Sequence, residues 1–304
     1  MKVDTHVHTF YSGRSTIKHL GPLLRESYNA PERVYRRAKA RGMDLVAITD
    51  HDEIAGALTL ADRPDVLVGC EVTGVFPDDG VRVHLGVLGL NEVQHREIQR
   101  LRVNVRDLMQ YLNREELFVS LNHVASRING DVTAVHIAAL MPWLNGLEVR
   151  NGSRLPVQNR TAMALAEACR KVTVAGSDSH TERGIGKTYV EAPHATTKEE
   201  FLTELHAGRV KVHGRQGNYL TMASDIVRVA SSFYRETVRD VATKPLQWRS
   251  HAAMACGLAS LPLMALPLVI AAGHFMLEDR FNKSLLVDLV ARPASAQLRG
   301  ALLR

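Results

Sequence analysis

The sequence predicts a parallel β/α barrel followed by a helical and strongly apolar tail. Between residues 1 and 215, runs of four to six β-branched and aliphatic residues alternate with segments of helical spacing about seven times. Such runs are typical of parallel strands buried on both faces, and the alternation is typical of a β/α barrel. We therefore expect a barrel over residues 1–215, a basic helical segment over 216–250, and a hydrophobic helix with a tail over 251–304.

The helical segments carry recognisable end signals. Two of them begin beside a proline, Pro31 or Pro156, a residue favoured in the first turn of a helix. Two end at a glycine, Gly42 or Gly208, which suits the left-handed residue that closes a helix. The segments expected to be helical span residues 32–41, 91–116, 156–171 and 196–207, and a further strand is expected at 146–149.

Residue types that bind metals follow the predicted strands. Six of the 14 histidines lie at or beside the ends of apolar runs, and a glutamate and an aspartate lie at two more. These eight candidate ligands are His6, His8, His51, Glu71, His84, His123, Asp178 and His180. Barrel enzymes build their active sites at the carboxyl ends of the strands. Imidazole with carboxylate suits zinc, manganese or iron, and a shared carboxylate suits a centre of two or three ions.

Bulk composition limits the class of protein. A chain of 304 residues with 45% hydrophobic content can bury the core of one barrel of about 200–250 residues and leave a tail. The three cysteines, Cys70, Cys169 and Cys256, are scattered and odd in number, which predicts a reducing compartment and no disulfide framework. The amino terminus enters a strand at once and shows no cleaved signal peptide, so we expect a cytoplasmic catalytic domain.

The net charge of +6 is concentrated in one stretch. Residues 205–250 hold eight basic and three acidic side chains, which accounts for +5 of the total. Because this stretch precedes an apolar segment and the barrel portion is close to neutral, it favours anionic lipid over nucleic acid. We expect no stable complex with nucleic acid.

The apolar segment after the basic stretch is long enough to cross a bilayer. The 28 positions between Arg249 and Glu278 carry no formal charge if the histidines are neutral, and residues 252–273 are almost wholly apolar. Pro262 and Pro267 are better tolerated in a membrane helix than in a soluble one. We expect residues 252–273 to anchor the catalytic domain at the inner face of a membrane. The alternative is a hydrophobic hairpin that packs on the barrel or on a second subunit.

Five motifs, taken in order, resemble those of a known family. They are His6-Val-His8, Thr49-Asp-His51-Asp52, Gly69-Cys-Glu71-Val72, Asn122-His123 and Asp178-Ser-His180. The set resembles the metal-binding motifs of the PHP (polymerase and histidinol phosphatase) superfamily and covers about residues 1–215. The first motif alone is weak because amidohydrolases share it, whereas the ordered set is specific. The resemblance implies a distorted (β/α)7, TIM-like barrel that hydrolyses phosphate esters with two or three divalent ions at the carboxyl ends of its strands.

The resemblance also implies how the ligands are divided among the ions. His6, His8 and Asp178 would hold a first ion. Glu71 would bridge this ion to a second one, held by His123 with or without His84. A third ion would be held by His51 with His180.

The sequence departs from the family pattern at one place. Relatives usually carry an Asp or His shortly after the first motif that binds the third ion, whereas Phe10-Tyr11-Ser12-Gly13-Arg14 contains neither. We therefore expect the third ion to be weakly held or absent, unless another residue such as His19 replaces the missing ligand. Arg14 would then bind the phosphate of the substrate through its guanidinium.

Phosphate-ester chemistry suits these residues independently of the resemblance. Phosphate monoesters react very slowly in water, so a catalyst must activate water and neutralise charge on the phosphate oxygens. Two ions bridged by a carboxylate do both, and Glu71 is the only glutamate directly at a predicted strand end. We expect Glu71, Asp178 and His180 to be catalytic. Asp50 and Asp52 are expected to orient imidazoles rather than to bind metal.

Further residues near the strand ends are expected to contact the substrate. Several arginines there predict an anion-binding rim, and an asparagine follows the sixth strand. The expected contacts come from Arg14, Arg127, Asn151 and Arg183, with Arg150 and Arg154 also on the rim.

These features predict a metal-dependent phosphatase or phosphodiesterase that acts on a small phosphorylated metabolite or nucleotide. One alternative is an amidohydrolase-type enzyme that cleaves C–N bonds. It usually needs a carboxylated lysine at a strand end in the middle of the barrel, and no lysine follows an apolar run between residues 66 and 150. Another alternative is a catalytically silent scaffold tethered to a membrane. The choice among phosphate esters has no code that one sequence reveals.

Overall fold

A curved sheet of nine strands forms the centre of the protein in a computed structural model. The structure describes residues 1–14, 25–127, 130–243 and 267–291 and positions 248, 251, 252, 254 and 255. The order across the sheet is β7-β6-β5-β4-β3-β2-β1-β8-β9. The strands are β1 Lys2–Asp4, β2 Leu45–Ile48, β3 Val66–Val75, β4 Arg82–Leu88, β5 Phe118–Leu121, β6 Gly146–Asn151, β7 Val172–Gly176, β8 Thr188–Glu191 and β9 Lys211–Gly214.

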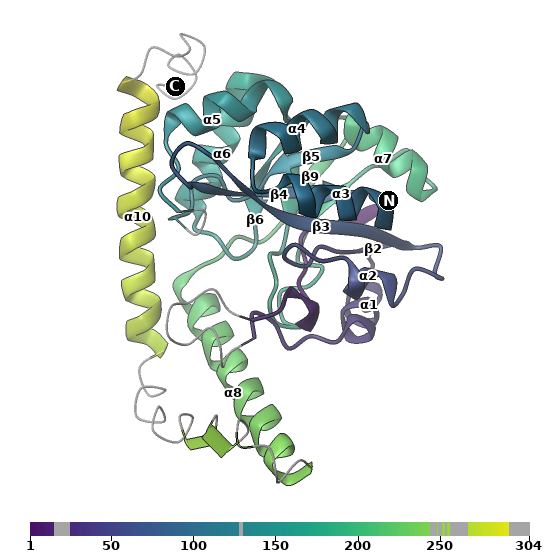
Figure 1. Ribbon diagram of the computed structural model, residues 1–304, viewed down its shortest axis with the longest axis vertical. Coiled ribbons are helices and arrows are strands. Elements are labelled where there is room, and N and C mark those ends of the chain that lie inside the picture. The colour runs from purple at the N-terminus through teal and green to yellow at the C-terminus, as the bar shows by residue number, and fades with distance from the viewer. Residues whose placement is uncertain are drawn as a thin grey trace.

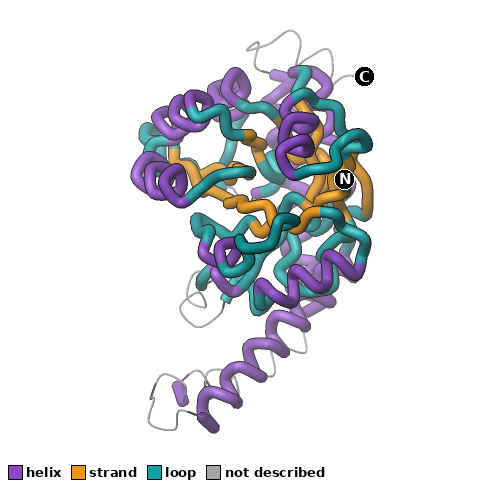
Figure 2. Tube along the Cα trace, turned by 90° about the vertical axis from the view of Figure 1, so that its right-hand side faces the viewer, coloured by secondary structure: helices purple, strands orange, loops and turns teal. Residues whose placement is uncertain are grey.

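The sheet nearly closes on itself where the chain leaves β1 and β7. Val7 and Ser179 form a parallel bridge just beyond these strands. The backbone amide of Asp178 donates to the carbonyl oxygen of His6 at 2.8 Å, and that of His8 donates to the carbonyl oxygen of Ser179 at 3.2 Å. The result is a barrel-like sheet with helices around its outside (Figures 1 and 2), which confirms the predicted α/β class.

The expectation that all the strands run parallel is wrong for β8, which pairs antiparallel with both β1 and β9, and for β4. This strand pairs antiparallel with both β3 and β5, and His84 lies near its beginning rather than at its carboxyl end. The physical reason is the short connection from β3, in which Phe76 and Val81 are joined by a backbone hydrogen bond of 2.8 Å. A hairpin of this length can only join antiparallel strands, because a parallel pair needs a long crossover.

The helices follow the predicted segments closely. The stretch expected at 91–116 is two helices rather than one, because Asn104 accepts a hydrogen bond from the amide of Arg106 and caps a new helix. The helices within the barrel domain are α1 Pro31–Ala40, α2 Ala55–Leu58, α3 Glu92–Leu101, α4 Val105–Arg114, α5 Ala134–Leu140, α6 Pro156–Cys169 and α7 Lys198–His206. Two short 3-10 turns, Phe10–Ser12 and Met141–Trp143, also belong to this domain.

Two long helices follow the barrel, α8 Tyr219–Thr243 and α10 Pro267–Ala291. They pack on each other, and α10 also packs on α6 and α5 along one side of the barrel (Figure 1). Leu285 and Leu289 of α10 are buried within the main hydrophobic core. The carboxylate of Glu278 on the same helix is also buried, and it accepts hydrogen bonds from Gln158 Nε2 and from the backbone amide of Arg127. Helix α10 is therefore an integral part of the folded domain.

The expected membrane segment, 252–273, lies mostly outside the described residues. Its last part, from Pro267, begins α10. In the part of the chain that the structure describes, we find no helix that is both long enough and apolar enough to span a membrane.

Candidate metal centre

Glu71 lies at the centre of a group of buried histidines at one end of the barrel. Its two carboxylate oxygens approach imidazole nitrogens of five histidines, and its side chain is fully enclosed. The distances are 2.9 Å to His123 Nε2, 3.1 Å to His51 Nδ1, 3.2 Å to His6 Nε2, 3.4 Å to His8 Nε2 and 3.5 Å to His84 Nδ1. Nitrogen and carboxylate ligand atoms thus converge on a small volume, as divalent transition metals require.

Asp178 contributes a second carboxylate to the same volume. Its Oδ1 lies 3.6 Å from His8 Nε2, 3.7 Å from His6 Nε2 and 3.6 Å from His180 Nδ1. The structure brings all eight predicted ligands together in overlapping groups whose ligand atoms lie within 4.8 Å of one another. The groups are His6–His8–Glu71, His6–His123–Asp178, His51–Glu71–His84 and His8–His51–His180.

The spacing of two residues within each motif explains part of this convergence. His6 and His8 follow β1, and Asp178 and His180 follow β7. In extended backbone, residues two apart point to the same face, so His6 and His8 both turn inward, whereas Asp178 is turned towards them by its left-handed backbone conformation. Because the two segments are joined beyond their strands, both pairs face the same volume.

The protonation of His6 is set by Glu148, on β6. Nδ1 of His6 lies 2.9 Å from Glu148 Oε1, and an ionised carboxylate can only accept a hydrogen bond. Nδ1 must therefore carry a proton, so Nε2, which faces Glu71 and Asp178, is the nitrogen that could bind a metal once its own proton is released. A carboxylate that orients an imidazole in this way is a common partner of metal-binding histidines.

A second relay sets the protonation of His8. The Ser12 hydroxyl donates its hydrogen to Asp50 Oδ1 at 2.7 Å, so it can only accept from His8 Nδ1, which lies 3.1 Å away. Asp50 is held in place by the amide and hydroxyl of Thr9, each at 2.6 Å. His8 therefore also presents the lone pair of Nε2 to the centre, and Asp50 acts on an imidazole through Ser12.

Several buried atoms at the centre fit a metal. In the part of the chain that the structure describes, Nε2 of His6, Nε2 of His8, Nδ1 of His84 and Oε2 of Glu71 are buried and make no hydrogen bond. Buried polar atoms are almost always hydrogen-bonded, and an exception calls for a specific explanation such as a bound ion. All four are metal-ligating atoms, and the donor set of imidazole nitrogen and carboxylate oxygen suits zinc, manganese or iron.

The two carboxylates are ionised at neutral pH. Burial raises the pKa of Glu71, but the surrounding histidines, His6 and His84 foremost, hold it well below its usual range. Burial also acts on Asp178, where Arg154 at 2.8 Å and then His6 hold the pKa well below the usual range. Ionised carboxylates are the form that binds cations.

His8 and His51 are neutral at physiological pH. Burial, with His180 as the next contributor, lowers the pKa of His8 to about 3. Burial likewise holds the pKa of His51 well below its usual range. His6 differs, because the attraction of Glu71 and other carboxylates outweighs its burial and raises its pKa well above the usual range. A cation entering the site would replace the positive charge of this imidazolium and release its proton.

The backbone at the site is strained. His123 has a φ of 29° and Asp178 a φ of 49°, in the left-handed region that non-glycine residues seldom adopt. Gly176, just before the Asp178 motif, is packed so closely against His6 that a Cβ atom would overlap the imidazole-bearing side chain. Strain of this kind persists only where the surroundings enforce it and is concentrated at functional sites.

Sequence reasoning missed the residues that support the ligands. Glu148 lies inside β6 and also accepts from the backbone amide of His123 at 3.0 Å. Arg154 is buried against Asp178 rather than exposed on a rim. The sequence signal for Glu148 is a lone carboxylate within an otherwise apolar strand. A search restricted to the ends of strands does not find it.

The residues expected to contact substrate occupy different environments. Asn151 is buried, and its amide donates to Glu148 at 2.8 Å and to Asp178 at 3.2 Å. The guanidinium of Arg127 lies 3.5 Å from the carboxylate of Asp131. The backbone of Arg14 forms an isolated antiparallel β-bridge with the backbone of Arg25. The carbonyl of Arg183 accepts from Arg41. Asn151 thus supports the ligands.

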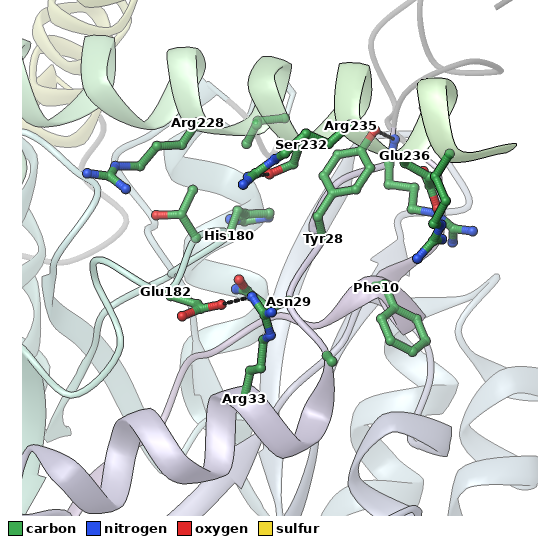
Figure 3. Close-up of a pocket in the computed structure, with 15 residues that line it drawn as sticks. Phe10, Tyr28, Asn29, Arg33, His180, Glu182, Arg228, Ser232, Arg235 and Glu236 are labelled. Atoms are coloured by element: carbon green, nitrogen blue, oxygen red, sulfur yellow. Dashed lines mark hydrogen bonds and ion pairs between the residues drawn. The ribbon is translucent and has the colours of Figure 1, made fainter. Parts of the chain in front are cut away.

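A cleft of about 830 Å³ opens beside the histidine cluster, and His180 is part of its lining. Helix α8 forms one wall of this cleft, and the loop before α1 together with the start of α1 forms the opposite wall (Figure 3). Its volume is within the range of about 300–1,000 Å³ that is usual for small-molecule sites.

The chain matches the PHP-associated family over residues 156–210. The resemblance to the PHP superfamily is confirmed. An uncharacterized protein of Methanocaldococcus jannaschii is 40% identical to this PHP-like chain over 77 residues, which are 24% of the chain and 44% of that relative. The match therefore spans less than half the length of the curated relative.

Solved structures are similar to the chain at low sequence identity. PsfC from Pseudomonas syringae is 20% identical, with a TM-score of 0.51, and the match covers 78% of this chain and 98% of PsfC. A candidate metal-dependent phosphoesterase from Bifidobacterium adolescentis is 17% identical, with a TM-score of 0.44, over 69% of this chain and 96% of that one. The similarity to PsfC shows that the PHP-like chain shares a known fold.

Proposed function

We propose that this protein is a metal-dependent hydrolase of phosphate esters, with Glu71, Asp178 and the surrounding histidines as its metal-binding residues. The observation that carries the proposal is the convergence of five imidazole nitrogens on the Glu71 carboxylate, in a pocket where its Oε2 has no hydrogen bond from any described residue. Structural histidines do not need a shared, unsatisfied acceptor, whereas a multinuclear metal site does.

The proposed roles follow the division of ligands that the family resemblance implies. His6 and His8 lie near Asp178 and hold one ion, His123 and His84 lie near Oε1 of Glu71 and contribute to a second, and Glu71 lies between the two sets. Divalent ions bound there supply Lewis acidity, which activates water and neutralises charge on the phosphate oxygens. Glu148, Ser12 and Asp50 keep the imidazoles of His6 and His8 in the tautomers that ligate.

His180 has a second proposed role, in handling the substrate. It lies both beside Asp178 Oδ1, at 3.6 Å, and in the lining of the cleft. A phosphate ester that entered the cleft would reach the metal-binding residues past this imidazole. The shape of the site thus supports the proposal that His180 is catalytic.

The number of ions is part of the proposal. The group His8–His51–His180 contains no carboxylate, and the family ligand that would complete it is replaced by Ser12-Gly13. Besides Asp178, the carboxylate of Glu26 lies 4.0 Å from Nε2 of His180, and a hydrogen bond from the backbone amide of Glu26 to the carbonyl of Gly13 holds it there. Residue His19 lies outside the described residues. We propose two tightly held ions and a weaker third.

Attachment to a membrane through residues 252–273 stays a prediction. The described start of α10 belongs to a helix that packs on the barrel, which favours the alternative of an apolar segment packed against the protein.

The experiment that tests the proposed function is a substrate panel with controlled metal. Metal-free protein is reconstituted with Mn²⁺, Zn²⁺ or Fe²⁺ and assayed on an aryl phosphate, a bis-aryl phosphodiester and an aryl amide. The proposal expects hydrolysis of a phosphate ester that depends on added metal. Cleavage of the amide alone would favour the amidohydrolase alternative, and absence of turnover on all three with metal bound would favour the silent scaffold.

A further inference from the structure

The cleft beside His180 has an unusually cationic wall. Five arginines line it, namely Arg25, Arg33, Arg228, Arg235 and Arg239, against the two carboxylates of Glu182 and Glu236. The two carboxylates are already paired, since Glu236 lies 3.2 Å from Arg25 and Glu182 lies 2.9 Å from Arg33. The charge left over therefore belongs to the three arginines of α8.

These three arginines make no salt bridge with a carboxylate anywhere in the described part of the chain. They are exposed to solvent on the cleft side of the helix, whereas Ala223, Phe233 and Thr237 are buried on its other side. A cationic surface that is left uncompensated beside a catalytic cleft attracts anions and raises their local concentration.

Helical geometry sets the arginines out in a row. Positions 228, 232, 235 and 239 are separated by three or four residues and so share one face of α8. Ser232 lies between the arginines in this row and also lines the cleft (Figure 3). With a rise of about 1.5 Å per residue, the row extends for about 16 Å.

The row begins close to the metal-binding residues. The carboxylate of Asp225, three residues before Arg228, accepts a hydrogen bond of 2.9 Å from the hydroxyl of Thr181, the neighbour of His180. This contact fixes the start of α8 at the catalytic end of the cleft. Arg235 and Arg239 therefore lie farther along the cleft, about 10 Å or more beyond Arg228 by the helical rise.

We propose that the arginine row of α8 (Arg228, Arg235 and Arg239) binds a second anionic group of the substrate, at a distance from the phosphate that is hydrolysed. The substrate class is then a small phosphate ester with a second phosphate or carboxylate several bonds away. Guanidinium groups suit this role because they form paired hydrogen bonds with phosphate and carboxylate oxygens. Phe10 and Tyr28, which also line the cleft, offer apolar surface for the part of the molecule between the two anions. The inference rests on the proposed phosphoesterase activity.

The test compares two matched esters with the full-length chain and added Mn²⁺. Hexanediol bisphosphate carries a second phosphate, whereas hexyl phosphate lacks it, and the measured quantity is the ratio of their kcat/KM values. We expect the bisphosphate to be preferred, and Arg235→Gln to lower the ratio by about tenfold, the usual effect of losing one charge-assisted hydrogen bond. Arg100→Gln is the matched control, because Arg100 pairs with Glu97 on α3 and does not line the cleft; it should leave the ratio unchanged.

Two outcomes would overturn the inference while leaving the phosphoesterase intact. One is hydrolysis of both esters at equal efficiency by the unmodified protein. The other is a ratio that Arg235→Gln does not change, with loss instead of sedimentation with phosphatidylserine vesicles, which would assign the arginines to a lipid surface. Calorimetry of hexanediol bisphosphate and of hexyl phosphate with metal-free protein measures the same preference without turnover. Tight binding of the bisphosphate alone, with no hydrolysis of either ester after metal is added, would contradict the proposed phosphoesterase activity. It would still support the proposal that the arginines of α8 bind a second anionic group.

Discussion

The metal-binding end of the barrel and the pair of helices α8 and α10 were equally conspicuous in the sequence, yet they differ in what fixes their structure. Four of the metal-binding residues, His6 with His8 and Asp178 with His180, are placed by a short local pattern in which a strand is followed by a ligand and a second ligand two positions later. The helix pair is placed by contacts with distant parts of the chain, such as Glu278 with Gln158 and Asp225 with Thr181. Local patterns can be read from one sequence, whereas distant partners cannot.

Removal of α10 should have the largest effect on the stability of the protein. Ending the chain after Thr243 would expose the core that Leu285 and Leu289 cover, at a cost of about 3–6 kcal/mol for these two side chains. Because domains are stable by only about 5–15 kcal/mol, the truncated chain should unfold at much lower urea concentration or aggregate. If α10 were only a membrane anchor, truncation would leave a soluble barrel of unchanged stability, which urea denaturation would reveal.

Metal removal probes the other region. A ligand that binds only the folded state stabilises it by about 4 kcal/mol when its free concentration is about 1,000 times its Kd. Treatment with a chelator should therefore lower the Tm, and Mn²⁺ or Zn²⁺ should restore it. A Tm that does not respond to any divalent ion would mean that the histidine cluster is structural.

Glu148 belongs to the metal-binding end of the barrel, but it is placed by contacts with distant residues that the sequence did not reveal. Glu148→Gln weakens the acceptor for His6 Nδ1 and should reduce metal affinity by about 10–100-fold, the usual effect of losing such a partner. Metal titration by calorimetry measures the change. Glu167→Gln, at an exposed position on α6, is the control and should bind metal as the unmodified protein does.

A single substitution in α10 tests how the helix is held on the barrel, with a smaller expected loss of stability than truncation. Glu278→Ala leaves the amide of Arg127 without its acceptor and Gln158 Nε2 with only the carbonyl of Ala125, which should destabilise the fold by about 1–3 kcal/mol. Asp279→Ala, on the next residue, removes only a pair with the exposed Lys283 and should cost less than about 1 kcal/mol. Equal effects of the two substitutions would show that the buried carboxylate does not hold α10 in place.

Much of the fold could be predicted because strand and helix patterns are local. The helix boundaries near Pro31 and Pro156 were found through their prolines, and the ligands were found through their positions after apolar runs. The sequence did not predict the direction of β4, although Pro77, Asp78, Asp79 and Gly80 are typical turn residues, because the apolar runs on either side are also typical of buried parallel strands.

The remaining features depend on side chains that meet only in three dimensions. The burial of Arg154 against Asp178 and the relay from Asp50 through Ser12 to His8 have no sequence pattern of their own. The basic stretch was assigned to lipid because its charges precede an apolar segment. That sequence order does not reveal that three of its arginines line a cleft beside His180.

The central claim is that Glu71 holds metal ions for the hydrolysis of phosphate esters, and Glu71→Gln tests it most directly. The measurement is bound metal, by elemental analysis, together with turnover of an aryl phosphate by the same sample, with Glu167→Gln as the control. The substitution keeps the volume but removes the charge at the meeting point of five imidazoles. We expect loss of bound metal and a fall in kcat/KM of about a thousandfold or more, since the ions supply several kcal/mol of transition-state stabilisation. Full metal content and undiminished turnover in a folded Glu71→Gln protein would contradict the account.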